Sequence, residues 1–238
     1  MIKTARQALS AAAVLACAMG VSAPAHAQFF ATICNDIQCT GGDDIIIQDN
    51  AAGDTVAATG AISFSTAAFG YSFLVNTSQS KPMLGSAAEP QLDLSFAATS
   101  TGTAGNVFIY TSDTGFTRAS GSALLTLGGT NSGASGTVTG RAWGGTSNTA
   151  LQFSGANLIS SLAGLTGPTF AGSATSAFAS VVSPYSLTIG MQITRASAGT
   201  TSGNLNLQVS AIPEPSIWAS IFMGAALVGF VSRRRRRR

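Results

Sequence analysis

YSLTIGMQIT, residues 185–194, alternates large apolar side chains with small or polar ones. A period of two puts every second side chain on one face, which predicts a strand with one buried face. LNLQV at 205–209 and LDLSF at 92–96 repeat the alternation. Further short candidates lie at 45–47, 61–65, 71–76, 107–111, 123–127, 137–143, 151–153 and 177–182. Glycine-rich breaks separate these segments, and residues 28–212 lack helical periodicity, so we predict an all-β, β-sandwich-like or barrel-like domain.

Charge is scarce and unevenly distributed along the 238 residues. Only 9% of residues are charged, and the formal net charge is +3. The terminal segments carry most of the cations, while residues 28–212 hold four cations against eight acids, a balance of 4 − 8 = −4. The cations of this span are Lys81, Arg118, Arg141 and Arg195; the acids are Asp36, Asp43, Asp44, Asp49, Asp54, Glu89, Asp93 and Asp113. A basic patch for nucleic acid is therefore not expected on this domain.

The N-terminus has the three parts of a secretory signal peptide. Lys3 and Arg6 give a positive start, residues 8–21 are apolar, and Ala25-His26-Ala27 places small residues at both required positions of a cleavage site. We predict that residues 1–27 are removed after Ala27, following export through the Sec machinery. A second interpretation treats residues 14–17, which end in Cys17, as a lipoprotein cleavage site.

Two cysteines remain after that cleavage, Cys34 and Cys39. An even count in an exported chain predicts a disulfide between them. The only histidine, His26, lies within the predicted signal peptide. The mature chain therefore lacks the base of a Ser-His-Asp triad and the usual ligand of catalytic zinc, and we predict that it is not an enzyme.

The C-terminal residues 212–238 form a second targeting segment in three parts. Pro213, Glu214 and Pro215 come first, and an uncharged apolar run at 217–231 follows. Its 15 residues would reach about 22 Å as a helix, less than the ~30 Å hydrocarbon core of a bilayer. The chain ends in six arginines, which would stay on the cytoplasmic side: Arg233, Arg234, Arg235, Arg236, Arg237 and Arg238.

This tail resembles the PEP-CTERM sorting signal, which combines a Pro-Glu-Pro motif, a short hydrophobic helix with an aromatic residue near its start, here Trp218, and a terminal arginine cluster. The body also resembles uncharacterised PEP-CTERM proteins at residues 33–36, 80–82, 90–94 and 112–117. The resemblance implies recognition and cleavage by exosortase, a membrane transpeptidase-like enzyme, and a Gram-negative host that makes exopolysaccharide. A permanent single-span anchor in the inner membrane is the other interpretation of the tail.

Three functional classes follow for the body at 28–211. The first is a structural or interaction protein of the cell surface, biofilm, floc or exopolysaccharide matrix. The second is a carbohydrate-binding module of that matrix; its candidate stacking residues are Trp143, Tyr71, Tyr110 and Tyr185, for which core packing is the alternative. The third is a glycoside hydrolase using paired carboxylates, with candidates Asp43, Asp44, Asp93 and Asp113.

The acids at 36–54 raise the question of a cofactor. Five of them fall in 19 residues, and Ca²⁺ prefers several oxygen ligands. Their spacing fits no EF-hand loop, and an acidic turn without metal explains them equally simply. We predict no cofactor, with a structural Ca²⁺ as the alternative.

Overall fold

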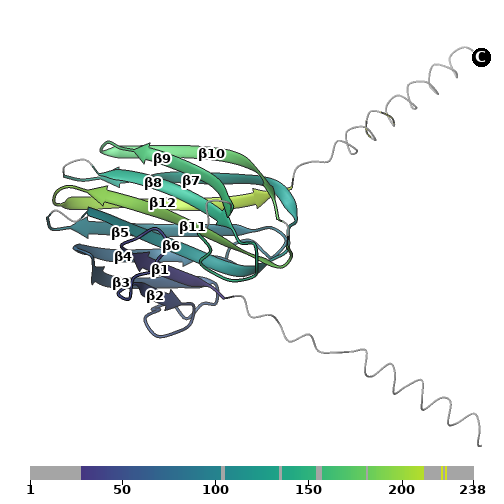
Figure 1. The fold of residues 1–238 in the computed structure, drawn as a ribbon, viewed down its shortest axis with the longest axis horizontal. Coiled ribbons are helices and arrows are strands. Elements are labelled where there is room, and N and C mark those ends of the chain that lie inside the picture. Colours follow the sequence, from purple (N-terminus) through teal and green to yellow (C-terminus); the bar gives the residue numbers. More distant parts are fainter. Residues whose placement is uncertain are drawn as a thin grey trace, which may run out of the picture.

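The described residues form twelve strands in two stacked antiparallel sheets (Figure 1). The computed structural model describes residues 28–102, 105–133, 136–153, 157–180, 182–211, 221 and 223. The strands are β1 (Phe30–Cys34), β2 (Ile45–Gln48), β3 (Ala61–Ala68), β4 (Tyr71–Gln79), β5 (Gln91–Ser100), β6 (Gly105–Phe116), β7 (Ser120–Asn131), β8 (Thr137–Gly144), β9 (Leu158–Leu165), β10 (Thr169–Ala179), β11 (Tyr185–Arg195) and β12 (Gly199–Ser210). The predicted β-sandwich is confirmed.

The targeting segments fall outside this description. The predicted signal peptide, the motif at 213–215 and the arginine cluster lie outside the described residues, as does nearly all of the apolar run at 217–231. Within the described part of the chain, we find no helix with the length and apolarity to cross a membrane.

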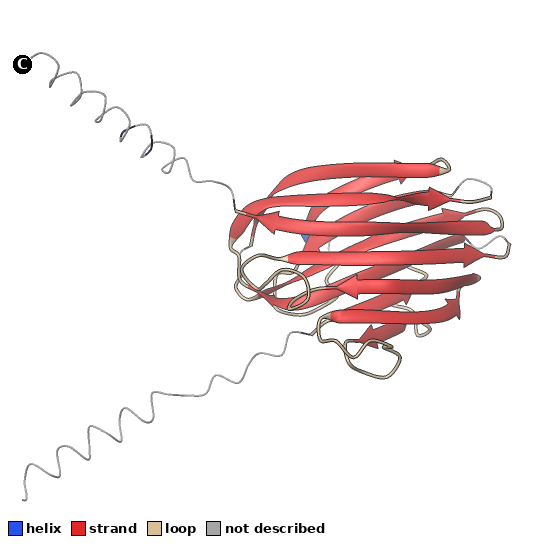
Figure 2. Cartoon of the chain, turned by 180° about the vertical axis from the view of Figure 1, so that it is seen from behind, coloured by secondary structure: helices blue, strands red, loops and turns tan. Residues whose placement is uncertain are grey.

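Sheet A has the order β2-β1-β6-β11-β8-β9, and sheet B has the order β10-β7-β12-β5-β4-β3. The last two strands of the chain therefore lie at the centres of the two sheets. β11 pairs with β6 and β8, and β12 pairs with β5 and β7. Strands dominate the whole domain when it is seen from behind (Figure 2).

The two alternating strands quoted first supply much of the core between the sheets. Leu187, Ile189 and Ile193 of β11 face Leu205 and Leu207 of β12, and all five side chains are fully buried. Burial of one face per strand at roughly 25 cal/mol per Å² is the main stabilising term. The alternation seen in the sequence thus reports the inward face of each sheet.

The sandwich has two distinguishable ends. At the exit end, Phe116 of β6 pairs with Tyr185 of β11, and the chain enters near Phe30 and leaves near Ser210 (Figure 1). At the far end, Gly105 pairs with Arg195, and the β11–β12 turn begins.

Some strand predictions were wrong. Residues 151–153 were expected to be a strand but form part of the loop between β8 and β9. Residues 177–182 were expected as one strand, whereas they hold only the last part of β10, which starts at Thr169. β1 and β9 were not predicted at all.

Candidate functional site

Two loops cover the outer face of sheet A and enclose a small aromatic cluster. The cluster consists of Phe108, Tyr110 and Trp143 on the sheet, with Ile37, Leu151 and Phe153 packed over it from the loops. The Tyr110 hydroxyl donates to the Ile37 carbonyl at 2.9 Å, and the Tyr110 and Phe153 ring centroids lie 4.5 Å apart. Leu151 and Phe153 pack on this cluster, which explains the two apolar residues at these positions.

A disulfide anchors one of these loops. Cys34 ends β1, and Cys39 lies in the loop after it, with 5.3 Å between their Cα atoms. Cys34 is fully buried beside the aromatic cluster. The bond therefore ties the loop at residues 35–44 to the sheet.

The four proposed sugar-stacking residues are all buried. Trp143 and Tyr110 are 3% and 1% exposed under the two loops. Tyr71 and Tyr185 are 2% and 0% exposed and belong to the core between the sheets. None of these four rings offers a free face to a sugar, so core packing is their role here.

The acids at 36–54 divide into two groups. Asp36 and Asp44 lie in the loop held by the disulfide, while Asp49 and Asp54 lie near the turn after β2. Asp54 Oδ1 accepts hydrogen bonds from the backbone N–H groups of Val56 and Ser63 at 3.0 and 3.1 Å. Asp54 therefore organises its own turn.

The two carboxylates of the disulfide loop are in opposite electrostatic situations. Desolvation acts to raise the pKa of the Asp36 carboxyl, but hydrogen bonds from Thr40 and Gln38 bring that pKa below its usual value. Burial and the nearby charges of Asp36 and Asp43 raise the pKa of the Asp44 carboxyl. Both Asp44 oxygens are enclosed without a hydrogen-bond donor of standard geometry among the described residues.

Asp44 also lies close to two sulfur atoms. Its carboxylate and the Cys34 and Cys39 sulfurs lie within 4.8 Å of one another. Because the two sulfurs are bonded to each other, this group does not offer two thiolates to a metal. The prediction of no cofactor, and its alternative of a structural Ca²⁺ among the acids at 36–54, both stay predictions.

A buried ion pair lies near the exit end. Lys81 Nζ is 2.7 Å from Asp113 Oδ2, and Asp113 is fully buried. Ser80 Oγ donates to the same oxygen at 2.5 Å, and the Thr114 N–H donates to Asp113 Oδ1 at 2.7 Å. Burial raises the pKa of the Asp113 carboxyl, and the Lys81 charge opposes that rise.

The far end contains a second buried cation, Arg195, which is 1% exposed. Its guanidinium donates to the Ser132 carbonyl at 2.7 Å, to Thr201 Oγ1 at 2.9 Å and to the Ser197 carbonyl at 3.4 Å. Thr201 Oγ1 in turn donates to Asn131 Oδ1 at 2.7 Å. Arg195 thus joins the β11–β12 turn to the loop after β7.

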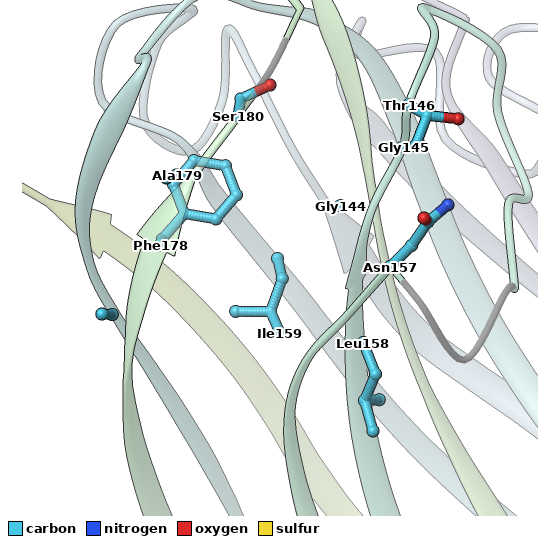
Figure 3. A pocket seen from close by; sticks show the side chains of 10 residues that line it. Gly144, Gly145, Thr146, Asn157, Leu158, Ile159, Phe178, Ala179 and Ser180 are labelled. Atoms are coloured by element: carbon cyan, nitrogen blue, oxygen red, sulfur yellow. The ribbon is translucent and has the colours of Figure 1, made fainter.

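A pocket of about 340 Å³ opens where β9 and β10 meet at the side of the sandwich (Figure 3). Ile159 and Phe178 line it and lie over Gly144, where an added Cβ would be 3.3 Å from both side chains. Thr146, Asn157 and Ser180 supply polar groups at its rim. All its lining residues are uncharged, which suits an apolar group better than acid–base chemistry.

The hydrolase candidates are spread over the molecule. Asp113 is buried in its ion pair, Asp93 lies on the outward side of β5, and Asp43 and Asp44 lie in the disulfide loop. The Asn204 side-chain amide donates to both Asp93 oxygens at 2.9 Å. Asp113 and Asp93 are not brought together as a pair flanking a cleft, which is the geometry that glycoside hydrolysis requires.

The outward face of sheet B presents many small polar side chains from its central strands. Its central strand β12 turns Asn204 and Gln208 outward as exposed side chains and buries Leu205 and Leu207. Thr99 and Thr200 bond across β5 and β12 at 2.9 Å, and Thr130 and Ser202 bond across β7 and β12 at 3.0 Å. Sequence reasoning noted the polar half of this alternation without treating it as a surface.

No family model matches the chain, and no curated protein matches it. Among solved structures, it is similar to a carbohydrate-binding module that recognises mannan, TmCBM27. That similarity has 11% identity and a TM-score of 0.34 and covers 63% of this chain and 89% of the module.

A tailspike protein of bacteriophage CBA120, in its enzymatically active domain, is similar at 10% identity and a TM-score of 0.30. That match covers 53% of this chain and 18% of the tailspike chain. Similarity at these levels carries no inference about ligand or activity.

Proposed function

We propose that this chain is an exported, non-catalytic β-sandwich that serves a structural or interaction role at the surface of a Gram-negative bacterium or in its exopolysaccharide matrix. The observation that carries the proposal is the disulfide between Cys34 and Cys39. Disulfides persist in oxidising compartments and are rare in the cytosol. The bond therefore supports an exported domain.

The placement of the ionisable groups supports a non-catalytic role. Lys81 and Asp113 neutralise each other in the interior, and Arg195 binds carbonyl and hydroxyl oxygens. Asp36 and Asp54 accept hydrogen bonds within their own loops. These five groups hold the domain together, and their partners occupy them, whereas general acid–base catalysis needs a group that can exchange a proton with a substrate.

The tail completes the proposal. Sorting through the motif at Pro213, Glu214 and Pro215, with exosortase as the partner, follows from the resemblance of the tail. The inner membrane would hold the chain transiently through the apolar run at 217–231, with the arginine cluster inside the cell.

The test is the intact mass of the protein recovered from its native host, measured with and without reduction followed by thiol alkylation. We expect a mass that lacks residues 1–27 and the segment after Pro215, with both cysteines protected until reduction. Replacing Pro213, Glu214 and Pro215 by alanine should leave the tail attached and the protein in the inner membrane. The neighbouring change Ser216→Ala is the matched control and should be processed normally.

Two results would reject parts of the proposal. An unaltered protein that keeps its arginine cluster would make the tail a permanent anchor. Free thiols on the protein as isolated would remove the argument for export.

A further inference from the structure

We infer that the outward face of sheet B, called the polar face below, binds a neutral polysaccharide chain. This inference deepens the proposed matrix role by naming the surface and the class of ligand. The polar face consists of the outward side chains of the three central strands β5, β12 and β7. They are Gln91, Asp93, Ser95, Ala97 and Thr99; Thr200, Ser202, Asn204, Asn206, Gln208 and Ser210; and Ser120, Ser122, Leu124, Thr126 and Thr130.

Pairing register aligns these side chains into rows across the strands. Asn206 pairs with Asp93 on one side and with Thr126 on the other. Gln208 likewise lies between Gln91 and Leu124. Because neighbouring strands are about 4.8 Å apart and same-face side chains about 6.8 Å apart along a strand, hydrogen-bonding groups recur closely in both directions.

The face is nearly free of charge. Asp93 is the only charged residue in the six strands of sheet B. Asn204 donates to both of its oxygens at 2.9 Å, and the Asn206 amide donates to Oδ1 at 3.4 Å. These bonds orient the two asparagine side chains by their nitrogens. Their amide oxygens receive no donor from the described residues and can accept hydrogen bonds from a ligand.

The chemistry of the face selects among classes of partner. Nucleic acid binding depends on cations that neutralise phosphates, and the polar face has none. The centres of protein interfaces are enriched in aromatic residues, methionine and arginine. The exposed large apolar residues of sheet B's strands are Leu74 and Leu124. Hydroxyl and amide groups in closely spaced rows match the donors and acceptors of a polymer of uncharged sugars.

The test is affinity electrophoresis of the protein recovered from its native host, in gels containing galactomannan, hydroxyethylcellulose or the anionic polymer alginate. We expect retardation by at least one neutral polymer and none by alginate. The triple variant Asn204→Ala/Asn206→Ala/Gln208→Ala should show no retardation. Several hydrogen bonds are lost together, so we expect its binding to be at least ~10-fold weaker.

Two further variants make the result specific. Gln91→Ala/Gln208→Ala removes amides without disturbing the bonds to Asp93 and should also weaken binding. The matched control is Asn106→Ala/Gln192→Ala, which removes two amides from sheet A and should bind normally. Circular dichroism and thermal unfolding establish that each variant is folded.

Three outcomes would overturn the inference. One is an unaltered protein that no neutral polymer retards; another is binding that survives the triple variant. The third is self-association in size-exclusion chromatography that the triple variant abolishes, which would make the polar face a protein interface. Each leaves the mass measurement of tail processing unaffected, so export and sorting are judged separately.

Discussion

The two ends of the sandwich each enclose one cation, and the groups around the two cations differ in kind. Near the exit end, the charged partner of Lys81 is a side chain, the carboxylate of Asp113, and Lys81 also donates to one backbone carbonyl, that of Thr114. At the far end, Arg195 is surrounded largely by backbone carbonyls, including those of Ser132 and Ser197. A double mutation can remove a cation and its side-chain partner together. A backbone carbonyl cannot be removed in this way, so it stays buried without a donor when the cation is lost. The far end should therefore depend more strongly on its cation.

The largest effect is expected from Arg195→Met. Removal of the guanidinium leaves the Ser132 and Ser197 carbonyls and Thr201 Oγ1 without a buried donor, so we expect a loss of about 4 kcal/mol in the free energy of unfolding. Urea denaturation measures it. Arg141→Met removes a partly exposed arginine of β8 and should cost less than about 0.5 kcal/mol. Equal losses in the two variants would contradict the special status of Arg195.

The ion pair should behave as a replaceable unit. Asp113→Asn or Lys81→Met alone leaves one buried charge without its partner, and each should cost about 3 kcal/mol. In the double variant the asparagine can still accept from the Thr114 N–H, and no buried charge remains. We expect its stability within about 1 kcal/mol of the unaltered protein. Additive losses in this double-mutant cycle would show that the pair is not a unit.

Two glycines, one beside each cation, allow the packing of the two ends to be compared. Gly199 has a φ of 147°, and an added Cβ would lie 2.0 Å from Arg195 Nη2. Gly115 has a φ of 81°, and its Cβ would meet Lys81 only at 3.8 Å. We expect Gly199→Ala to cost about 2–3 kcal/mol through strain and displacement of the guanidinium.

Gly115→Ala should cost only about 1 kcal/mol, from the left-handed backbone alone. Thermal unfolding of the two variants side by side makes the measurement. A larger loss at Gly115 would mean that the exit end is the more tightly packed of the two.

The smallest effect concerns pH. Burial raises the pKa of the Asp113 carboxyl above its unfolded value. For a carboxyl with a raised folded pKa, the protonated folded state is favoured, so stability falls as pH rises through that pKa. Lys81→Met removes the charge that opposes the rise. Its deficit against the unaltered protein should therefore shrink by about 1 kcal/mol between pH 8 and pH 5.

Arg195→Met supplies the reference for this experiment. Its deficit should stay constant over the same pH range, because the acceptors named for Arg195 do not titrate there. Urea titrations at several pH values give both curves. If the stability deficits of the two variants changed with pH in the same way, Asp113 would not be the group that distinguishes the exit end from the far end.

The sequence predicted strands in which large apolar side chains alternate with small or polar ones. β11 is buried on both faces over Tyr185–Met191, yet its outer face carries the small residues Ser186, Thr188 and Gly190, so the alternation is still visible. Residues 185–194 and 205–209 alternate, and they form β11 and β12. β1 reads FATIC and is buried on both faces at Ala31–Cys34, so it shows no alternation to detect. Leu151 and Phe153 cover sheet A's outer face from a loop, and their alternation with Gln152 cannot be distinguished from that of a strand by sequence alone.

The candidate sites were less accessible to prediction. The polar half of the 205–209 alternation was visible, but its enlargement by β5 and β7 depends on pairings across more than 70 residues. Lys81 and Asp113 are separated by 32 residues, and no local pattern joins them. The polar face and the ion pair both depend on which strands pair over long sequence separations. Residue spacing and composition do not reveal that pairing.

The central positions of β11 and β12 have a consequence for the order of folding during synthesis. Before residue 185 is made, sheet A exists only as β2-β1-β6 and β8-β9, and sheet B only as β10-β7 and β5-β4-β3. The last two described strands, β11 in sheet A and β12 in sheet B, each fill the gap in their own sheet. Contacts so distant in sequence close slowly. Under the export that we propose, in which the chain threads a channel unfolded, this arrangement is an advantage, because the native state has to wait for the final strands.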